Sequence, residues 1–322
     1  MSEPSRRWWR GSHAGRVRSL GILFPFLALF LVLSLTSPPF HTRDNLLNIL
    51  DQQSATLIIA AAGTLVLVAG GIDLSVGSTY SLAGVTSGWF ALRTNPALAI
   101  LLGIGAGVLV GLANGVITTR FRINALITTL AMSFVVGGCA ALITKGNLLV
   151  LFDKPAFGDL ARTEFLTVRT SIWLMVGAVI ATGLLLATTT AGRYMYAAGG
   201  NSEAARLAGV RVDGVRVLAF VLSGAAAGLA GVIDTSRVLS AQASSADTGL
   251  AFTVLAGIVV GGTSILGGEG AVWRTVVGVL FIALIGNGYV LLGLDPLYEQ
   301  ITMGVILLAA VGLDVWTRRA RT

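Results

Sequence analysis

The chain has 322 residues, of which 55% are hydrophobic and only 11% are charged. Soluble domains contain roughly 25% charged residues, so this chain lacks the residues to cover a large apolar core with a polar surface. The composition therefore excludes an ordinary soluble protein and predicts an integral membrane protein. The net charge of +7 follows from membrane topology and gives no reason to expect binding to nucleic acid.

Ten charge-free stretches predict the membrane spans. Nearly all of them reach the roughly 17–25 residues that a spanning helix needs. We therefore predict an all-α, polytopic membrane protein with about ten transmembrane helices, some of them broken or re-entrant. The ten stretches are 19–42, 52–72, 74–92, 94–119, 123–144, 170–192, 217–233, 248–268, 275–294 and 300–313.

The distribution of cations predicts the orientation. Of the 22 Lys and Arg residues, 15 fall on the side of the N-terminus and 7 on the other side. Cytoplasmic loops carry the excess of Lys and Arg, so we expect a multi-pass protein of the cell membrane with both termini in the cytoplasm. The predicted parts are a basic tail 1–18, a transmembrane domain 19–316 with a cytoplasmic segment 193–216 and an external loop 145–169, and a basic tail 317–322.

The cytoplasmic segment holds a predicted short helix. Asn201 or Ser202 can cap its start, the alanine-rich run that follows favours helix, and Gly209 suits the left-handed position after its end. Two turns of mixed polarity cannot cross a membrane, so the helix must lie on the cytoplasmic face. It is either an ordinary capped surface loop or a docking element, with Ala204, Ala205, Leu207 and Ala208 as a small apolar face.

One carboxylate, Asp73, lies where two apolar stretches meet. The glycines on both sides of it indicate a broken or re-entrant backbone, with the carboxylate near the start of the next helix, where an anion is stabilised. Asp73 caps that helix through the amides of Ser75 and Val76, takes part in gating, or contacts a partner subunit. A second glycine-rich turn, 258–270, weakly resembles the first, 67–78. The gating or structural positions are Gly70, Gly71, Asp73, Ser75, Gly77, Gly261, Gly262, Thr263, Ser264, Gly267 and Gly268.

The sequence contains no recognisable catalytic motif. It has no His–Cys cluster with metal-ligand spacing, no phosphate-binding P-loop and no nucleophile elbow. We therefore expect a protein that is not an enzyme and that holds no metal and no cofactor of its own. The predicted spans are almost bare of charge, which argues against an ion-coupled secondary carrier. That carrier and a non-transporting scaffold remain the alternatives.

Three stretches together resemble the permease subunit of ABC importers for monosaccharides: "GGIDLSVGS", "GRYMYAAGGNSEAARLAGVRVDGVR" and "GIVVGGTSILGGEGAVWRTVVGVL". This family includes the ribose, xylose, arabinose and galactose importers and the autoinducer importer, and the similarity runs from about Asn45 to about Asp314. The resemblance implies a subunit that moves a monosaccharide or similar small polar solute by alternating access. The implied partners are a cytoplasmic ATPase that binds ATP and Mg, an extracytoplasmic solute-binding protein, a second permease copy in a homodimer, and the lipid membrane.

The resemblance also assigns residues. Glu203-Ala204-Ala205 matches the glutamate-alanine-alanine position of the family's cytoplasmic coupling helix, and Asp73 matches the acidic residue of its glycine-flanked motif. Where the family often reads G-G-R-G, this chain has Gly267-Gly268-Glu269-Gly270, so no role is carried over to that turn. The implied ATPase-coupling residues are Gly200, Asn201, Ser202, Glu203, Ala204, Ala205, Arg206, Leu207, Ala208 and Gly209.

Overall fold

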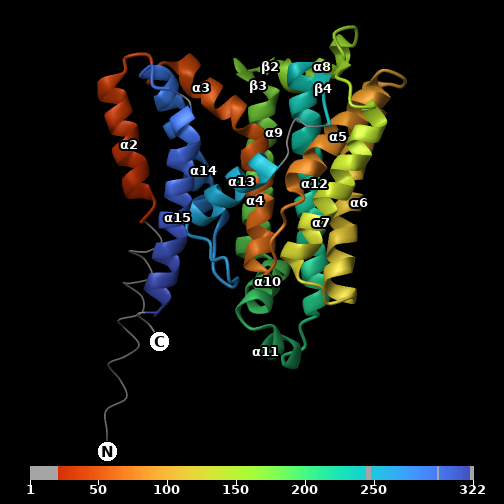
Figure 1. Ribbon diagram of the computed structural model, residues 1–322, viewed down its shortest axis with the longest axis vertical. Helices are drawn as coiled ribbons and strands as arrows, with labels where there is room; N and C mark the ends of the chain where they lie inside the picture. The colour runs from red at the N-terminus through yellow and green to blue at the C-terminus, as the bar shows by residue number, and fades with distance from the viewer. Residues whose placement is uncertain (1–20, 244–247, 296, 320–322) are drawn as a thin grey trace, which may run out of the picture.

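The computed structural model describes residues 21–243, 248–295 and 297–319 and is built almost entirely of helices (Figure 1). The predicted tail 1–18 lies outside these residues, as does the end of the predicted tail 317–322. The helices are α2 (Leu23–Thr36), α3 (Arg43–Gln52), α4 (Ser54–Val68), α5 (Val76–Ala91), α6 (Pro96–Arg120), α7 (Ala125–Thr144), α8 (Pro155–Arg162), α9 (Thr170–Thr188), α10 (Thr190–Gly200), α11 (Ser202–Leu207), α12 (Val212–Val238), α13 (Thr248–Val260), α14 (Val272–Leu291) and α15 (Leu297–Arg319).

Two short antiparallel ribbons complete the described structure. Strand β1 (Leu149–Val150) pairs with β4 (Ser240–Ala241), and β2 (Glu164–Phe165) pairs with β3 (Val168–Arg169). The β1–β4 ribbon joins the predicted external loop to the end of α12, although the two strands are far apart in the sequence. It therefore fixes the position of that loop over the helices.

Five of the described helices are long and apolar enough to cross a membrane: α6, α7, α9, α12 and α14. A sixth candidate is the pair α3 and α4, which is bent by 51° at the break between them. Each of the ten predicted stretches contains a helix, but α2, α4, α5 and α13 have only 13–16 residues. The helical, polytopic class is confirmed, and the number of ten spans stays a prediction.

Helix α12 is the centre of the bundle and packs against α4, α5, α6 and α10. Its contact with α6 is a direct approach of two backbones, because a Cβ placed on Gly107 would lie 2.2 Å from the carbonyl oxygen of Gly224. Large apolar side chains remain exposed on the outer helices, among them Leu101 and Leu109 on α6 and Phe134 on α7. Close glycine packing inside and exposed apolar residues outside are typical of a helix bundle in lipid.

The two ends of the bundle carry different elements. Helices α3 and α8 and the strands lie at one end, called here the α8 end, and α10 and α11 lie at the other, the α11 end (Figure 1). The segments 145–169 and 193–216 therefore lie at opposite ends of the bundle. Helices α2 and α15 lie side by side with α14 at one edge of the bundle (Figure 1). The expectation that both termini lie in the cytoplasm stays a prediction.

Candidate functional site

Helix α11 is held at both ends by local hydrogen bonds. The Oδ1 atom of Asn201 accepts from the amides of Glu203, at 3.1 Å, and Ala204, at 3.0 Å, which is the expected N-cap. At the other end Gly209 has a φ of +85°, and the amide of Val210 donates to the carbonyl of Ala205 at 3.0 Å. This glycine-terminated bond pattern is the Schellman motif. Six residues are therefore ordered as a helix at the very end of the bundle.

The apolar face predicted for α11 is divided between two surfaces. Ala205 is only 5% exposed and packs within the protein with Met195, Ala198 and Val212, so the prediction that it faces a partner is wrong. Its methyl group instead holds α11 onto α10 and α12. Leu207 is 86% exposed, and Glu203, Ala204 and Ala208 are also exposed. The surface available to a partner is therefore centred on Leu207.

Three chain segments meet at four glycines, Gly70, Gly199, Gly267 and Gly268, which we call the glycine junction. A Cβ on Gly199 would lie 1.9 Å from the carbonyl oxygen of Val68, and one on Gly267 would lie 2.9 Å from the Cα atom of Gly70. The amide of Gly268 donates to the carbonyl of Val68 at 2.9 Å. Only glycine fits at these contacts, so the end of α10, the α4–α5 turn and the α13–α14 turn touch through their backbones.

Two side chains reinforce the junction. The Tyr196 hydroxyl donates to the carbonyl of Gly270 at 2.7 Å, and Nε of Arg216 donates to the carbonyl of Ala69 at 3.3 Å. Burial raises the pKa of the Tyr196 phenol, and the positive charge of Arg274 offsets only part of this effect. The hydroxyl is therefore a protonated donor throughout the neutral pH range.

The later glycine-rich turn has a structural arrangement of its own. Thr263 and Ser264 are both buried, and the Ser264 hydroxyl accepts from the amide of Leu266 at 3.1 Å. Gly262 has a φ of +82°, and a Cβ on Gly261 would lie 2.5 Å from the carbonyl oxygen of Arg274. These predicted residues therefore shape the α13–α14 connection and place its glycines at the junction.

Asp73 links the start of α5 to α12, and through Ser75 to α6. Its Oδ1 atom accepts from the amide and the hydroxyl of Ser75, at 3.0 and 2.7 Å, and Oδ2 accepts from the hydroxyl of Ser223 on α12 at 2.8 Å. Asn114 on α6 then donates to the Ser75 hydroxyl at 2.7 Å. The expected bond from the Val76 amide is absent among the described contacts, because Ser75 itself stands at the N-cap of α5. Gly77 is buried in the first turn of α5, and Gly71 lies against Phe220.

Comparison with known proteins identifies the family. Residues 45–311 match the model of the family described as branched-chain amino acid transport system / permease component. The chain belongs to this permease family. It is 37% identical over 296 residues to the ribose import permease protein RbsC of Escherichia coli K12, covering 91% of this chain and 92% of the relative. No solved structure gives a significant match.

Two further relatives agree with this assignment. The permease is 38% identical over 318 residues to the L-arabinose ABC transporter permease protein AraH of Azospirillum brasilense, covering 97% of this chain and 92% of the relative. It is 37% identical over 305 residues to the ribose import permease protein RbsC of Bacillus subtilis, covering 93% of this chain and 94% of the relative. The resemblance to permeases of sugar ABC importers is confirmed, and these relatives are transport subunits.

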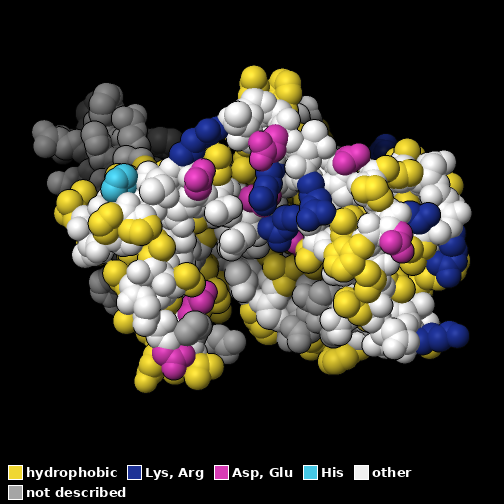
Figure 2. All heavy atoms as spheres, turned by 90° about the horizontal axis from the view of Figure 1, so that it is seen from above, with side chains coloured by type: hydrophobic (Ala, Val, Ile, Leu, Met, Phe, Trp, Pro, Cys, Tyr) yellow, Lys and Arg dark blue, Asp and Glu magenta, His cyan; other side chains and the backbone are white. Residues whose placement is uncertain are grey.

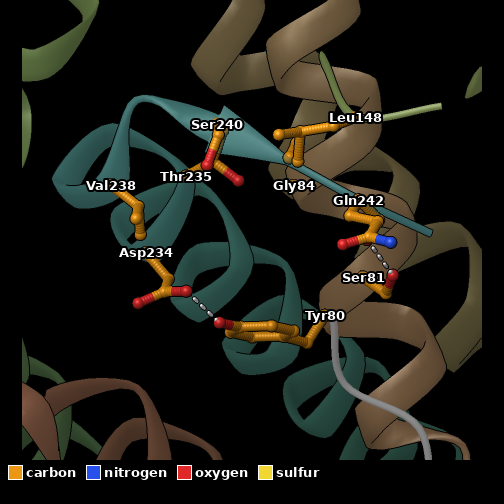
Figure 3. Close-up of a pocket in the computed structure, with 10 residues that line it drawn as sticks. Tyr80, Ser81, Gly84, Leu148, Asp234, Thr235, Val238, Ser240 and Gln242 are labelled. Atoms are coloured by element: carbon orange, nitrogen blue, oxygen red, sulfur yellow. Dashed lines mark hydrogen bonds between the residues drawn. The ribbon is translucent and has the colours of Figure 1, made fainter. Parts of the chain in front are cut away.

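A second polar cluster in the permease, toward the α8 end, was not predicted from the sequence. Asp51, only 4% exposed, accepts from Nη1 of Arg169 at 2.5 Å and from the hydroxyl of Ser171. Arg237 donates to the carbonyl of Asp51 at 3.1 Å and pairs with Asp234. The hydroxyl of Tyr80 donates to Asp234 (Figure 3). These residues connect α3, α9, α12 and α5.

The available sequence signal for this charge cluster was weak. Asp51 precedes one predicted span, and Asp234 and Arg237 follow another, so each looks like an ordinary interfacial charge. Only the i, i+3 spacing of Asp234 and Arg237 favoured a local ion pair. Within the described residues, no three His, Cys, Asp or Glu side chains lie close enough together to hold a metal ion.

Proposed function

We propose that the permease is the membrane-spanning subunit of an ATP-driven importer that moves a monosaccharide or a similar small polar solute across the cell membrane. Relatives that match more than nine-tenths of the chain are ribose and L-arabinose permeases. One structural observation carries the coupling part of the proposal. The rigidly capped helix α11 presents Leu207 to solvent and is joined to the core through the glycine junction.

The proposed assembly contains two copies of the permease, each with about ten spans and with both termini in the cytoplasm. A separate ATPase at the α11 end binds ATP and Mg, and a solute-binding protein delivers the cargo at the α8 end. The permease itself needs no cofactor for this role. Exposed large apolar side chains on the outer helices support burial in lipid or against a second copy.

The proposed mechanism is alternating access driven through α11. Movement of the ATPase displaces α11, which cannot slide freely on α10 and α12 because Ala205 is packed between them. The end of α10 contacts the α4–α5 and α13–α14 turns with no space for even one methyl group. Close-packed backbones transmit displacement because they cannot be compressed. A shift of α11 therefore moves the starts of α5 and α14 together.

The test replaces Leu207 with Asp in the complete complex reconstituted in liposomes. An exposed apolar residue that anchors an interface contributes at least about 2 kcal/mol, so we expect assembly with the ATPase to weaken roughly 30-fold. ATP hydrolysis should then stop responding to the sugar-loaded binding protein. Leu166→Asp is the matched control, since Leu166 is 70% exposed in the β2–β3 turn of the α8 end.

Three results would contradict the proposal. Normal co-purification and normal stimulated hydrolysis with Leu207→Asp would show that α11 is only a surface loop. Uptake of sugar into vesicles that hold an ion gradient but no ATP would favour the ion-coupled carrier instead. A deletion strain with unchanged uptake of every pentose and hexose would favour a scaffold.

A further inference from the structure

A polar cavity lies between α5, α12 and the β1–β4 ribbon, away from the glycine junction (Figure 3). Its volume is about 230 Å³, slightly below the roughly 300–1,000 Å³ of pockets that hold drug-sized ligands. The size therefore suits a smaller molecule. Six of the ten lining residues are polar: Tyr80, Ser81, Asp234, Thr235, Ser240 and Gln242.

Two hydroxyl groups in this cavity have no hydrogen-bond partner among the described residues. Thr235 is only 5% exposed, yet its hydroxyl is not bonded to the carbonyl one turn earlier, as Thr253 and Thr302 are bonded in other helices. Ser240, on β4, is the second. Neither oxygen is among the buried unpartnered side-chain atoms, so both are accessible from the cavity. A hydroxyl can donate one hydrogen bond and accept two, so these groups favour a ligand that both donates and accepts hydrogen bonds.

Asp234 supplies acceptors on the same cavity wall. One oxygen of its carboxylate accepts from the Tyr80 hydroxyl and the other from Arg237. A carboxylate offers about four lone-pair positions, so one further acceptor position remains on each oxygen. Because Arg237 balances the charge of Asp234, the wall has no net charge. This favours an uncharged ligand over a cation or an anion.

The cavity is kept open and walled by specific contacts. The Ser81 hydroxyl bonds to the carbonyls of Gln242 and Ala243, at 3.0 and 2.7 Å, which holds the chain after β4 against α5. Gly84 faces Thr235, and a Cβ at this position would lie 2.6 Å from the Thr235 hydroxyl. The absence of a side chain at Gly84 therefore preserves the space in front of that hydroxyl.

We propose that this cavity is a sugar-contact site of the permease, in which the Thr235 and Ser240 hydroxyls and the Asp234 carboxylate bind an uncharged polyhydroxylated molecule. This inference rests on the proposed function, because it places the site on the side where the binding protein would release its cargo. The ring of Tyr80 and the side chains of Leu148 and Val238 complete the lining and provide an apolar wall for the C–H face of a sugar.

The test measures binding to the permease directly, without ATPase or binding protein. In a Cys139→Ala background, Ser240→Cys introduces a thiol at the cavity, and its reaction with a small maleimide is followed in detergent. We expect D-ribose or L-arabinose, at tens of millimolar, to slow this reaction at least threefold, while glycine betaine at the same osmolarity does not. Adding Thr235→Val should raise the sugar concentration that halves the labelling rate about three- to tenfold. Adding Thr235→Ser instead, which keeps the hydroxyl, should leave that concentration at its original value.

A matched control separates loss of the contact from damage to the fold. Thr182→Val removes a hydroxyl that bonds only within its own helix, to the carbonyls of Ala178 and Val179, and should leave protection unchanged. Equal thiol reactivity with and without either sugar, in a permease that melts like the wild type, would overturn the site. Protection by sugar in a complex that shows no ATP-driven uptake would keep the site and refute the proposed importer instead.

Discussion

The two ends of the permease are held together by different kinds of contact. At the α11 end, three segments touch through backbone atoms at the glycine junction. At the α8 end, side chains from α3, β3 and α12 meet in the network of Asp51, Arg169, Arg237 and Asp234. Backbone contact leaves no alternative arrangement, whereas ion pairs and hydrogen bonds can exchange partners. The difference suggests a stiff end that transmits motion and an adaptable end that meets the cargo.

The largest effect is expected from Gly199→Ala, which adds a methyl group at the glycine junction of the stiff end. The new methyl group would lie 1.9 Å from the carbonyl oxygen of Val68 and 2.6 Å from the amide nitrogen of Gly268, and neither backbone atom can rotate away. Overpacking costs about 1–3 kcal/mol and more where the backbone must move. We expect a loss of about 3 kcal/mol or more and no transport, measured as apparent melting temperature and uptake.

Gly200→Ala is the matched control for this substitution. No heavy atom lies within 4 Å of a Cβ at Gly200, so the melting temperature should stay within a degree or two of the wild type. Equal stability of the two variants would show that the glycine junction is not a close backbone contact.

The next largest effect is expected from Asp51→Asn, which removes one carboxylate from the charge network of the adaptable end. The change removes the carboxylate partner of Arg169, which is half exposed and can turn to water, while Arg237 keeps its ion pair with Asp234. We therefore expect a destabilisation of about 1–3 kcal/mol, below the full effect of breaking a buried ion pair. Asp44→Asn on the same helix, where the carboxylate is exposed, should be neutral. If the Asp51 variant were as stable as the Asp44 variant, the charge network would not stabilise the α8 end.

Local patterns predicted much of the fold and part of the site. Each apolar stretch contains a helix because a chain in lipid must satisfy its backbone internally. Asn201 and Gly209 were correctly placed at the two ends of α11 because caps depend on neighbouring residues only. The resemblance between the turns 67–78 and 258–270 was also visible in the sequence. The contact of Gly199 with both turns could not be predicted from it.

Contacts between distant residues could not be predicted in this way. Ser223 meets Asp73 across 150 positions, and Asp51 meets Arg237 across 186. Ala205 looked like part of a partner surface because helical periodicity in six residues cannot tell an inner face from an outer one. The break between α3 and α4 occurs at Gln53, away from the glycines that favour a break, so packing and not local preference determines it.

A smaller effect is expected from Asp73→Asn, at the start of α5. The remaining oxygen can still accept from Ser75, and the Ser223 hydroxyl can turn to accept from the new amide. Because every partner keeps a hydrogen bond, we expect at most about 1 kcal/mol of lost stability. A lower uptake rate in this stable variant would show that the charge contributes to gating. Wild-type uptake would leave Asp73 as a purely structural residue.

The smallest global effect is expected from Asn201→Ala, which loosens α11 alone. Loss of an N-cap costs about 1 kcal/mol, and six residues cannot remain helical without it. We expect faster hydrogen exchange over 202–207 and weaker stimulation of the ATPase, with an unchanged melting temperature. Ser202→Ala, which removes a side chain without a cap bond, should exchange like the wild type.

The most direct test is thiol labelling and cross-linking at the two ends of the permease. Leu207→Cys and Leu166→Cys, each in a Cys139→Ala background, place one thiol on α11 and one in the β2–β3 turn. We expect Leu207→Cys to react only with reagents that reach the cytoplasm and to cross-link to the ATPase, and Leu166→Cys to react with impermeant reagents from outside. Labelling of Leu207→Cys from outside, or its failure to cross-link in an assembled complex, would contradict the account.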